Sequence, residues 1–98
     1  MNQIRGETVL LMDGKPQVLC LTLGALAEIE TALGMSDLSD LSVRLEKISA
    51  NDVVLLLAAL LNGGGNAMSI AQIQAARTDP AEVAKAIAKA FSLAGSDE

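Results

Sequence analysis

The run VVLLLAALL, Val53–Leu61, constrains the fold more than any other part of the sequence. Ser49 and Asp52 precede it with the S-x-x-D spacing of a capping box, and the glycine-rich segment NGGGN, Asn62–Asn66, follows it. A helix of nine residues rises only about 14 Å, whereas a bilayer core is about 30 Å thick, so this run cannot span a membrane. A helix that is apolar nearly all round belongs inside a protein. We therefore expect a central buried helix over residues 50–62.

The N-terminal part of the chain is predicted to form a β-hairpin over residues 6–22. Its two apolar segments flank Asp13-Gly14, which favours a two-residue type I′ turn because both central residues need a positive φ. With these residues in the turn, the expected pairs are Met12 with Lys15, Leu11 with Pro16 and Val9 with Val18. Pro16 cannot donate a hydrogen bond to a ladder, so the second strand should face away from any further strand at that point.

Both faces of this hairpin are largely apolar. The register places on one face Thr8, Leu10, Met12, Leu19 and Leu21. It places on the other face Val9, Leu11, Val18 and Cys20. A hairpin in water normally keeps one face polar, so we predict that the second face is an interaction face for a partner or for a second copy of the chain. The alternative is that the last helix, which carries Phe91, folds over this face within the same chain.

The rest of the chain is predicted to be helical. Apolar side chains recur at steps of three and four residues, and capping residues separate the segments. The expected helices span residues 23–33, 38–47, 50–62, 69–77 and 80–93, with a frayed tail over 95–98. Thr22 should cap the first helix, Gly34 should end it, and Asp79-Pro80 should start the last helix. We therefore predict a single α+β domain over residues 1–98, in which an N-terminal antiparallel β-hairpin precedes about five short helices packed as a small bundle.

The apolar stripes of these elements define a predicted core. The stripe of the first helix is expected to begin at Leu23. The core side chains are predicted to be Leu10, Leu21, Leu26, Ile29, Leu33, Leu56, Leu60, Ile87 and Phe91.

The sequence offers little chemistry for catalysis or for metal binding. It has no histidine, so Cys20 lacks the usual base of a cysteine nucleophile and is better explained as a small apolar strand residue. Asp37 and Asp40 could share a helix face and hold a cation weakly, but helix capping explains them better. The segment GGGN, Gly63–Asn66, follows a helix and has no lysine nearby, which favours a flexible link over a phosphate cradle. We expect no enzymatic activity, no metal and no cofactor.

The charge balance argues against another class of partner. Seven Lys and Arg residues against twelve Asp and Glu residues give a net charge of −5, and the basic residues are scattered. Nucleic-acid binding needs clustered Lys and Arg, so nucleic acid is a poor partner. The start of the chain, MNQIRGE, lacks the basic and long apolar regions of a signal peptide, and one cysteine forms no intramolecular disulfide. These features predict a cytoplasmic protein with no membrane partner.

Two segments together resemble a known protein family. The first is GETVLLMDGKPQVLCLTLGALAEIETALG, Gly6–Gly34, with its G-E start, its DG turn and the helix LTLGALAEIE that ends in ALG. The second is SANDVVLLLAALLNGGG, which is similar to an S-x-x-D helix with a glycine-rich exit. Both resemble the small tail protein encoded in the structural gene clusters of gene transfer agents and related siphophages. The resemblance covers most of Gly6–Gly65 and thins after Met68.

This resemblance implies a role in building a phage-like tail, in a gene transfer agent or a prophage. Members of the family are described as tail-tube-associated proteins or, more often, as tail assembly chaperones, which coat the tape-measure protein until tube subunits polymerise around it. The implied partners are the tape-measure protein, the tail-tube protein or both. Two alternatives stay open, a permanent structural subunit of the tail tube or its end, and a small regulatory protein-binding adaptor. The chain departs from the family in its unusually apolar second hairpin face, at Leu11 and Cys20.

Overall fold

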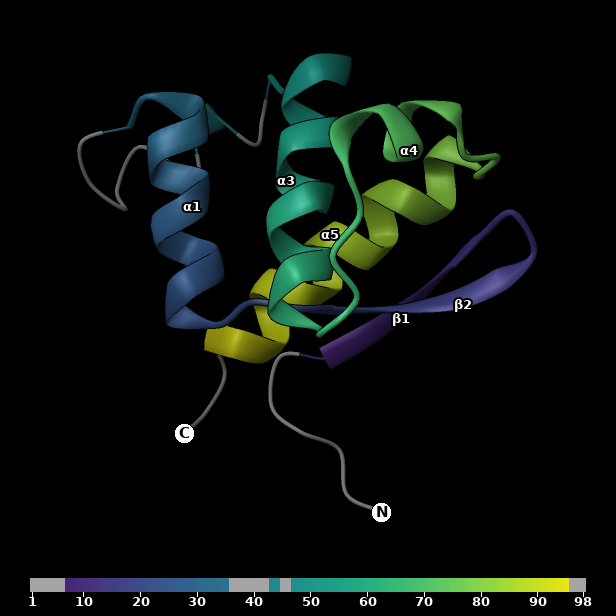
Figure 1. The fold of residues 1–98 in the computed structure, drawn as a ribbon. Coiled ribbons are helices and arrows are strands. Elements are labelled where there is room, and N and C mark those ends of the chain that lie inside the picture. Colours follow the sequence, from purple (N-terminus) through teal and green to yellow (C-terminus); the bar gives the residue numbers. More distant parts are fainter. Residues whose placement is uncertain (1–6, 36–42, 45–46, 96–98) are drawn as a thin grey trace.

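The computed structural model describes residues 7–35, 43–44 and 47–95, and residues 92–95 enter only as backbone. This part of the chain forms an antiparallel hairpin followed by helices (Figure 1). The elements are β1 (Glu7–Met12), β2 (Lys15–Cys20), α1 (Leu23–Leu33), α3 (Ala50–Gly63), α4 (Ile70–Ala75) and α5 (Pro80–Gly95). The predicted α+β class is confirmed, with four helices in the described residues instead of about five. The helix predicted over residues 38–47 lies largely outside the described residues.

The hairpin forms in the predicted register. Its pairs include Val9 with Val18, Leu11 with Pro16 and Met12 with Lys15. The turn residues Asp13 and Gly14 have φ values of 57° and 77°, as a type I′ turn requires. The tip is fastened to the loop between α4 and α5 by two hydrogen bonds. The Asp13 N–H donates to the Arg77 carbonyl oxygen at 2.9 Å, and the Arg77 N–H donates to Asp13 Oδ1 at 2.9 Å.

Side-chain caps set the ends of the helices, largely where the sequence predicts them. Thr22 Oγ1 accepts a hydrogen bond from the Ala25 N–H at 3.0 Å, and Gly34 ends α1 with a φ of 70°. Asp79 Oδ1 accepts from the Ala81 N–H at 2.9 Å at the start of α5. Ser69 and Gln72 form a complete capping box. Ser69 Oγ accepts a hydrogen bond from the Gln72 N–H, and the Gln72 side chain accepts one from the Ser69 N–H. This box caps the short helix α4 and was not among the predicted caps.

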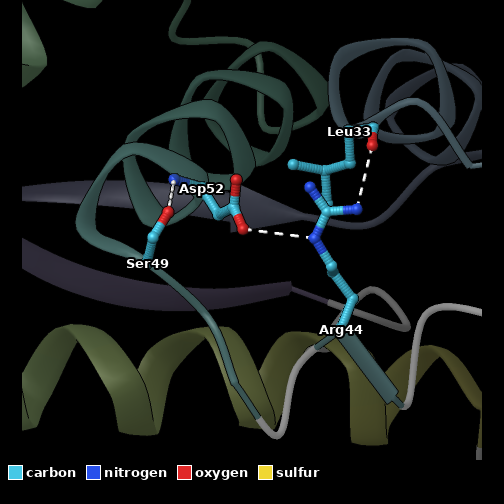
Figure 2. A network of polar contacts seen from close by, with 4 residues as sticks. All are labelled: Leu33, Arg44, Ser49 and Asp52. Carbon is cyan, nitrogen blue, oxygen red and sulfur yellow. Dashed lines mark hydrogen bonds and ion pairs between the residues drawn. The ribbon is translucent and has the colours of Figure 1, made fainter.

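The capping box predicted for α3 forms only in half. Ser49 Oγ accepts from the Asp52 N–H at 3.1 Å, but the Asp52 carboxylate turns to Arg44 (Figure 2). Arg44 Nε donates to Asp52 Oδ2 at 3.3 Å, and Arg44 Nη1 donates to the Leu33 carbonyl oxygen at 2.9 Å. The guanidinium thus satisfies a carbonyl at the end of α1 and pairs with a carboxylate at the start of α3. It ties the two helices together at this end.

The core is organised around α3, which packs against α1, β2 and α4, while α5 packs against β1 (Figure 1). Six of the predicted core residues are buried, namely Leu10, Ile29, Leu33, Leu56, Leu60 and Ile87. The other three, Leu21, Leu26 and Phe91, are partly buried against the same core. Leu23, in contrast, is 85% exposed. The prediction that the apolar stripe of α1 begins at Leu23 is therefore wrong at this residue. The buried stripe of α1 follows Ala25, Ile29 and Leu33, and Leu23 lies to one side of it.

The glycine run at the end of α3 is a packing site at Gly63 and Gly64, which corrects the prediction of a flexible link. A Cβ on Gly63 would lie 2.2 Å from the Cys20 carbonyl oxygen, and one on Gly64 would lie 2.2 Å from the Val18 carbonyl oxygen. Real side chains cannot approach a carbonyl oxygen so closely. The end of α3 therefore sits directly against the backbone of β2 because both positions lack a side chain.

Candidate interaction surfaces

The predicted interaction face of the hairpin is divided by the packing of α3. All four of its residues lie on one side of the sheet, as the pairs Val9–Val18 and Glu7–Cys20 require. Val9 and Leu11 are 57% and 60% exposed. Val18 is half-buried and Cys20 is buried, beside the end of α3. The structure thus leaves the β1 half of the predicted face open, and α5 packs against β1 without covering Val9 or Leu11.

Cys20 has the environment of a structural residue. Burial, and secondarily the negative charge of Glu7, raise the pKa of the Cys20 thiol above its ordinary value. The thiolate is the reactive form of cysteine, so a raised pKa lowers its reactivity at neutral pH. Cys20 therefore lies in β2 as a small buried side chain and contributes little to an exposed surface.

The two edges of the hairpin differ in accessibility. Met12 and Lys15 flank a two-residue turn and form a hydrogen-bonded pair. Hydrogen-bonded and non-hydrogen-bonded pairs alternate along an antiparallel hairpin, and the residues of the non-hydrogen-bonded pairs point their backbone N–H and C=O groups away from the other strand. On β2 these outward residues are Pro16, Val18 and Cys20. Pro16 has no N–H, and the carbonyls of the other two meet Gly64 and Gly63. The edge of β2 is therefore closed.

On β1 the outward residues are Glu7, Val9 and Leu11. Beyond the hairpin itself, no hydrogen bond joins the backbone of these three residues to another described residue. An open hollow of about 730 Å³ lies beside this strand. Val9, Leu10, Leu11 and Gly14 form its hairpin side, and the segment from Arg77 to Asp79 together with Glu82 forms its other side. No described residue outside the hairpin pairs with the edge of β1, so a further strand can pair there.

A second surface is a groove bounded by α3, α4 and α5, with a volume of about 650 Å³. Its apolar lining includes Met12, Val53, Leu57, Ile73, Val83 and Ile87. None of its sixteen lining residues carries a charge, and its polar lining is limited to Asn51, Gln74 and Thr78. The alanines of α5 that line it, Ala84 and Ala88, are exposed. The groove therefore offers apolar contact area on a wall with little side-chain bulk.

Sequence reasoning did not identify this groove. Its lining comes from β1, from the start of α3, from α4 and from α5, so it exists only once these segments have packed together. One signal was present in the sequence: the exposed alanines of α5 lie beside its buried stripe, where a surface helix more often carries charged residues.

The described residues contain no group of three or more His, Cys, Asp or Glu side chains arranged to hold a metal ion. Among the helices that the structure describes, none combines the length and the apolarity needed to cross a bilayer. What the two surfaces do present is apolar side chains and the free backbone groups of an edge strand. These are the features by which protein modules recognise helices and strands of other proteins.

Comparison with known proteins gives this module a family. The protein-family model described as phage tail tube protein, GTA-gp10, matches residues 5–95. Because the match spans nearly the whole chain, the protein belongs to this family of phage and gene transfer agent tail proteins. The family resemblance inferred from Gly6–Gly65 is thereby confirmed, and it extends through α4 and α5. No curated protein and no solved structure matches the chain.

Proposed function

We propose that this phage tail protein is a non-enzymatic tail assembly chaperone that binds a helical segment of the tape-measure protein during tail morphogenesis. The observation that carries the proposal is the uncharged groove between α3, α4 and α5. An amphipathic helix binds such a groove with its apolar face, through side chains at i, i+3, i+4 and i+7. The exposed Ala84 and Ala88 allow the backbone of that helix to approach α5 closely.

Charge supports the same assignment. The chain carries a net charge of −5, yet none of the described residues that line the groove is charged. An apolar helix face can therefore be covered without burying an unpaired charge, while the acidic remainder of the surface keeps the complex from associating further. A partner helix with basic residues outside its apolar face would meet a complementary field. This combination suits a protein that shields a long helical partner until assembly.

The second candidate is a permanent subunit of the tail tube or its end, and the description of the family favours it. The open edge of β1 gives such a subunit a surface for pairing with a neighbouring tail protein. A ring of identical subunits joined strand to strand needs two free edges in each subunit. Here the β2 edge is closed by Pro16, Gly63 and Gly64, and this favours the chaperone. Family membership makes both tail roles better supported than a regulatory adaptor.

The proposed groove is tested by a matched pair of substitutions on α5. Ala84→Glu places a charge in the groove, whereas Ala81→Glu places the same charge on an exposed position of the same helix that does not line the groove. We expect Ala84→Glu to lose the tape-measure protein in co-purification and Ala81→Glu to retain it, because only the first substitution buries an unpaired carboxylate on binding.

Equal binding by the two variants would contradict the groove as the binding site. Mass spectrometry of purified particles then separates the two tail roles. A chaperone is absent from finished particles, whereas a tube subunit is present in many copies. Abundant protein in the particles would replace the chaperone assignment by the structural one.

A further inference from the structure

We propose that the open edge of β1 pairs antiparallel with the same edge of a second copy of this chain, which gives a two-fold dimer with a continuous sheet in the order β2-β1-β1-β2. The proposal is independent of the proposed function, because it rests on the hairpin and not on the groove.

The first argument is that β1 has unused pairing capacity. The backbone N–H and C=O groups of Glu7, Val9 and Leu11 point away from β2. No described residue outside the hairpin bonds to them, and the side chains of Val9 and Leu11 are 57% and 60% exposed. An edge strand with apolar exposed side chains and free backbone groups is a template for another strand. It contains none of the prolines or lysines that usually block such an edge.

The second argument identifies the partner as a second copy. Among the residues that the structure describes, each copy has one usable edge, because the end of α3 and Pro16 close the edge of β2. A surface that pairs with itself about a two-fold axis closes after two copies, whereas pairing through two different edges would continue into a ring or a fibre. A hairpin with one open edge therefore forms a closed dimer, and no further copies can be added through its strands.

The third argument is the register, which the outward residues determine. If the two-fold axis passes beside Val9, Val9 lies opposite the partner subunit's Val9, and Glu7 lies opposite the partner subunit's Leu11. All three outward residues of each strand then take part in hydrogen-bonded pairs. An axis at Glu7 would instead place two carboxylates opposite each other, which is unfavourable. The sequence of β1 thus favours one antiparallel register.

The surroundings of the edge fit this register. The hollow of about 730 Å³ beside β1 gives room for the added strand. Three charged residues line it, Arg77, Asp79 and Glu82. The hydrogen bonds between Asp13 and Arg77 hold the backbone of Arg77 at the hairpin tip. The added strand brings the partner subunit's Glu7 to the level of Leu11, at the end of the edge near the tip. Arg77 has no ion pair with another described residue, so it can complement this carboxylate.

Cross-linking tests the register directly. In a Cys20→Ala background, Val9→Cys places two thiols across the axis, at a Cα separation of about 5.5 Å, which a disulfide can span. Leu11→Cys is the matched control, because the two copies of residue 11 would lie about 14 Å apart, four residues of strand rise. We expect a disulfide-linked dimer for Val9→Cys under mild oxidation and none for Leu11→Cys. Cross-linking of Leu11→Cys but not of Val9→Cys would overturn the register and with it the proposal.

Backbone pairing is tested separately by light scattering across a dilution series. Val9→Pro removes an outward N–H without touching the β1–β2 ladder, so the fold seen by circular dichroism should persist. We expect it to raise the dimer dissociation constant about tenfold or more, since each dimer loses two hydrogen bonds. Val9→Ala, which keeps the N–H, should have a smaller effect, and Leu23→Lys on the exposed start of α1 should have none. A wild-type protein that stays monomeric, or that pairs its β1 only with a strand of another tail protein, would overturn the proposal.

Discussion

At the scale of single residues, Gly63 and Gly64 do more for this structure than their position in a glycine run suggests. They let the last turn of α3 rest on the outward carbonyls of Cys20 and Val18. The same contact closes one edge of the hairpin and withdraws Cys20 from the surface. Two residues without side chains therefore decide which part of the hairpin is left for partners.

This role predicts opposite effects for the same substitution at two glycines. Gly63→Ala should destabilise the protein by about 1–3 kcal/mol or more, because its Cβ would lie 2.2 Å from a backbone oxygen that cannot move aside cheaply. Gly24→Ala, also in a helix, meets nothing nearer than 3.8 Å and should stabilise the protein by up to about 1 kcal/mol. Urea unfolding at one fixed protein concentration measures both. Similar stabilities for the two variants would show that the contact between α3 and β2 is loose.

At the scale of elements, the central position of α3 has an energetic consequence. Leu56 is fully buried, and the helix that carries it contacts α1, β2 and α4. Leu56→Ala should therefore cost about 2–5 kcal/mol of unfolding free energy, the sum of lost burial and a residual cavity. Leu23→Ala is the matched control at an exposed leucine and should change stability by less than about 0.5 kcal/mol. A small loss at Leu56, measured by the same denaturant titration, would contradict its place in the core.

The elements that the sequence predicted correctly are those set by local chemistry. The register of the hairpin follows from the positive φ values of Asp13 and Gly14, and α1 begins and ends at Thr22 and Gly34 because these residues satisfy its end groups. Each of these features depends on a few neighbouring residues. The nearly uniform apolarity of Val53–Leu61 likewise predicted a buried helix without any knowledge of its neighbours.

The features that could not be predicted depend on how distant elements meet. The hairpin pattern predicts the same environment for Val9 and Cys20. Val9 is exposed and Cys20 is buried because α3 packs against β2 and leaves this face of β1 open. The half-formed capping box of α3 was also not predicted, because Asp52 bonds to Arg44, which lies outside the capping pattern of Ser49 and Asp52. The groove between α3, α4 and α5 forms only when these helices and β1 have packed together, and the exposed alanines of α5 were the one sign of it in the sequence.

At the scale of the whole molecule, the two proposed surfaces are bounded by the same segment. The loop from Arg77 to Asp79 lies beside the hollow at β1, and Thr78 lines both this hollow and the groove between the helices. This loop is tied to the hairpin tip through Asp13, across 64 residues of sequence. The tie thus holds together the N-terminal hairpin and the start of α5, which are the two walls of the hollow.

The last prediction concerns the hydrogen bonds between Asp13 and Arg77. Asp13→Ala removes the acceptor for the Arg77 N–H and also places an alanine at a φ of 57°, where only a short polar side chain or glycine is comfortable. We expect a loss of about 1–3 kcal/mol in unfolding free energy, together with faster amide exchange at Arg77. Asp13→Asn keeps both the side-chain oxygen and the tolerance for positive φ, so it should remain within about 0.5 kcal/mol of wild type. Denaturant titration and hydrogen exchange measure these effects. If Asp13→Asn were as damaging as Asp13→Ala, the negative charge of Asp13, and not its hydrogen bond, would be what joins the hairpin to α5.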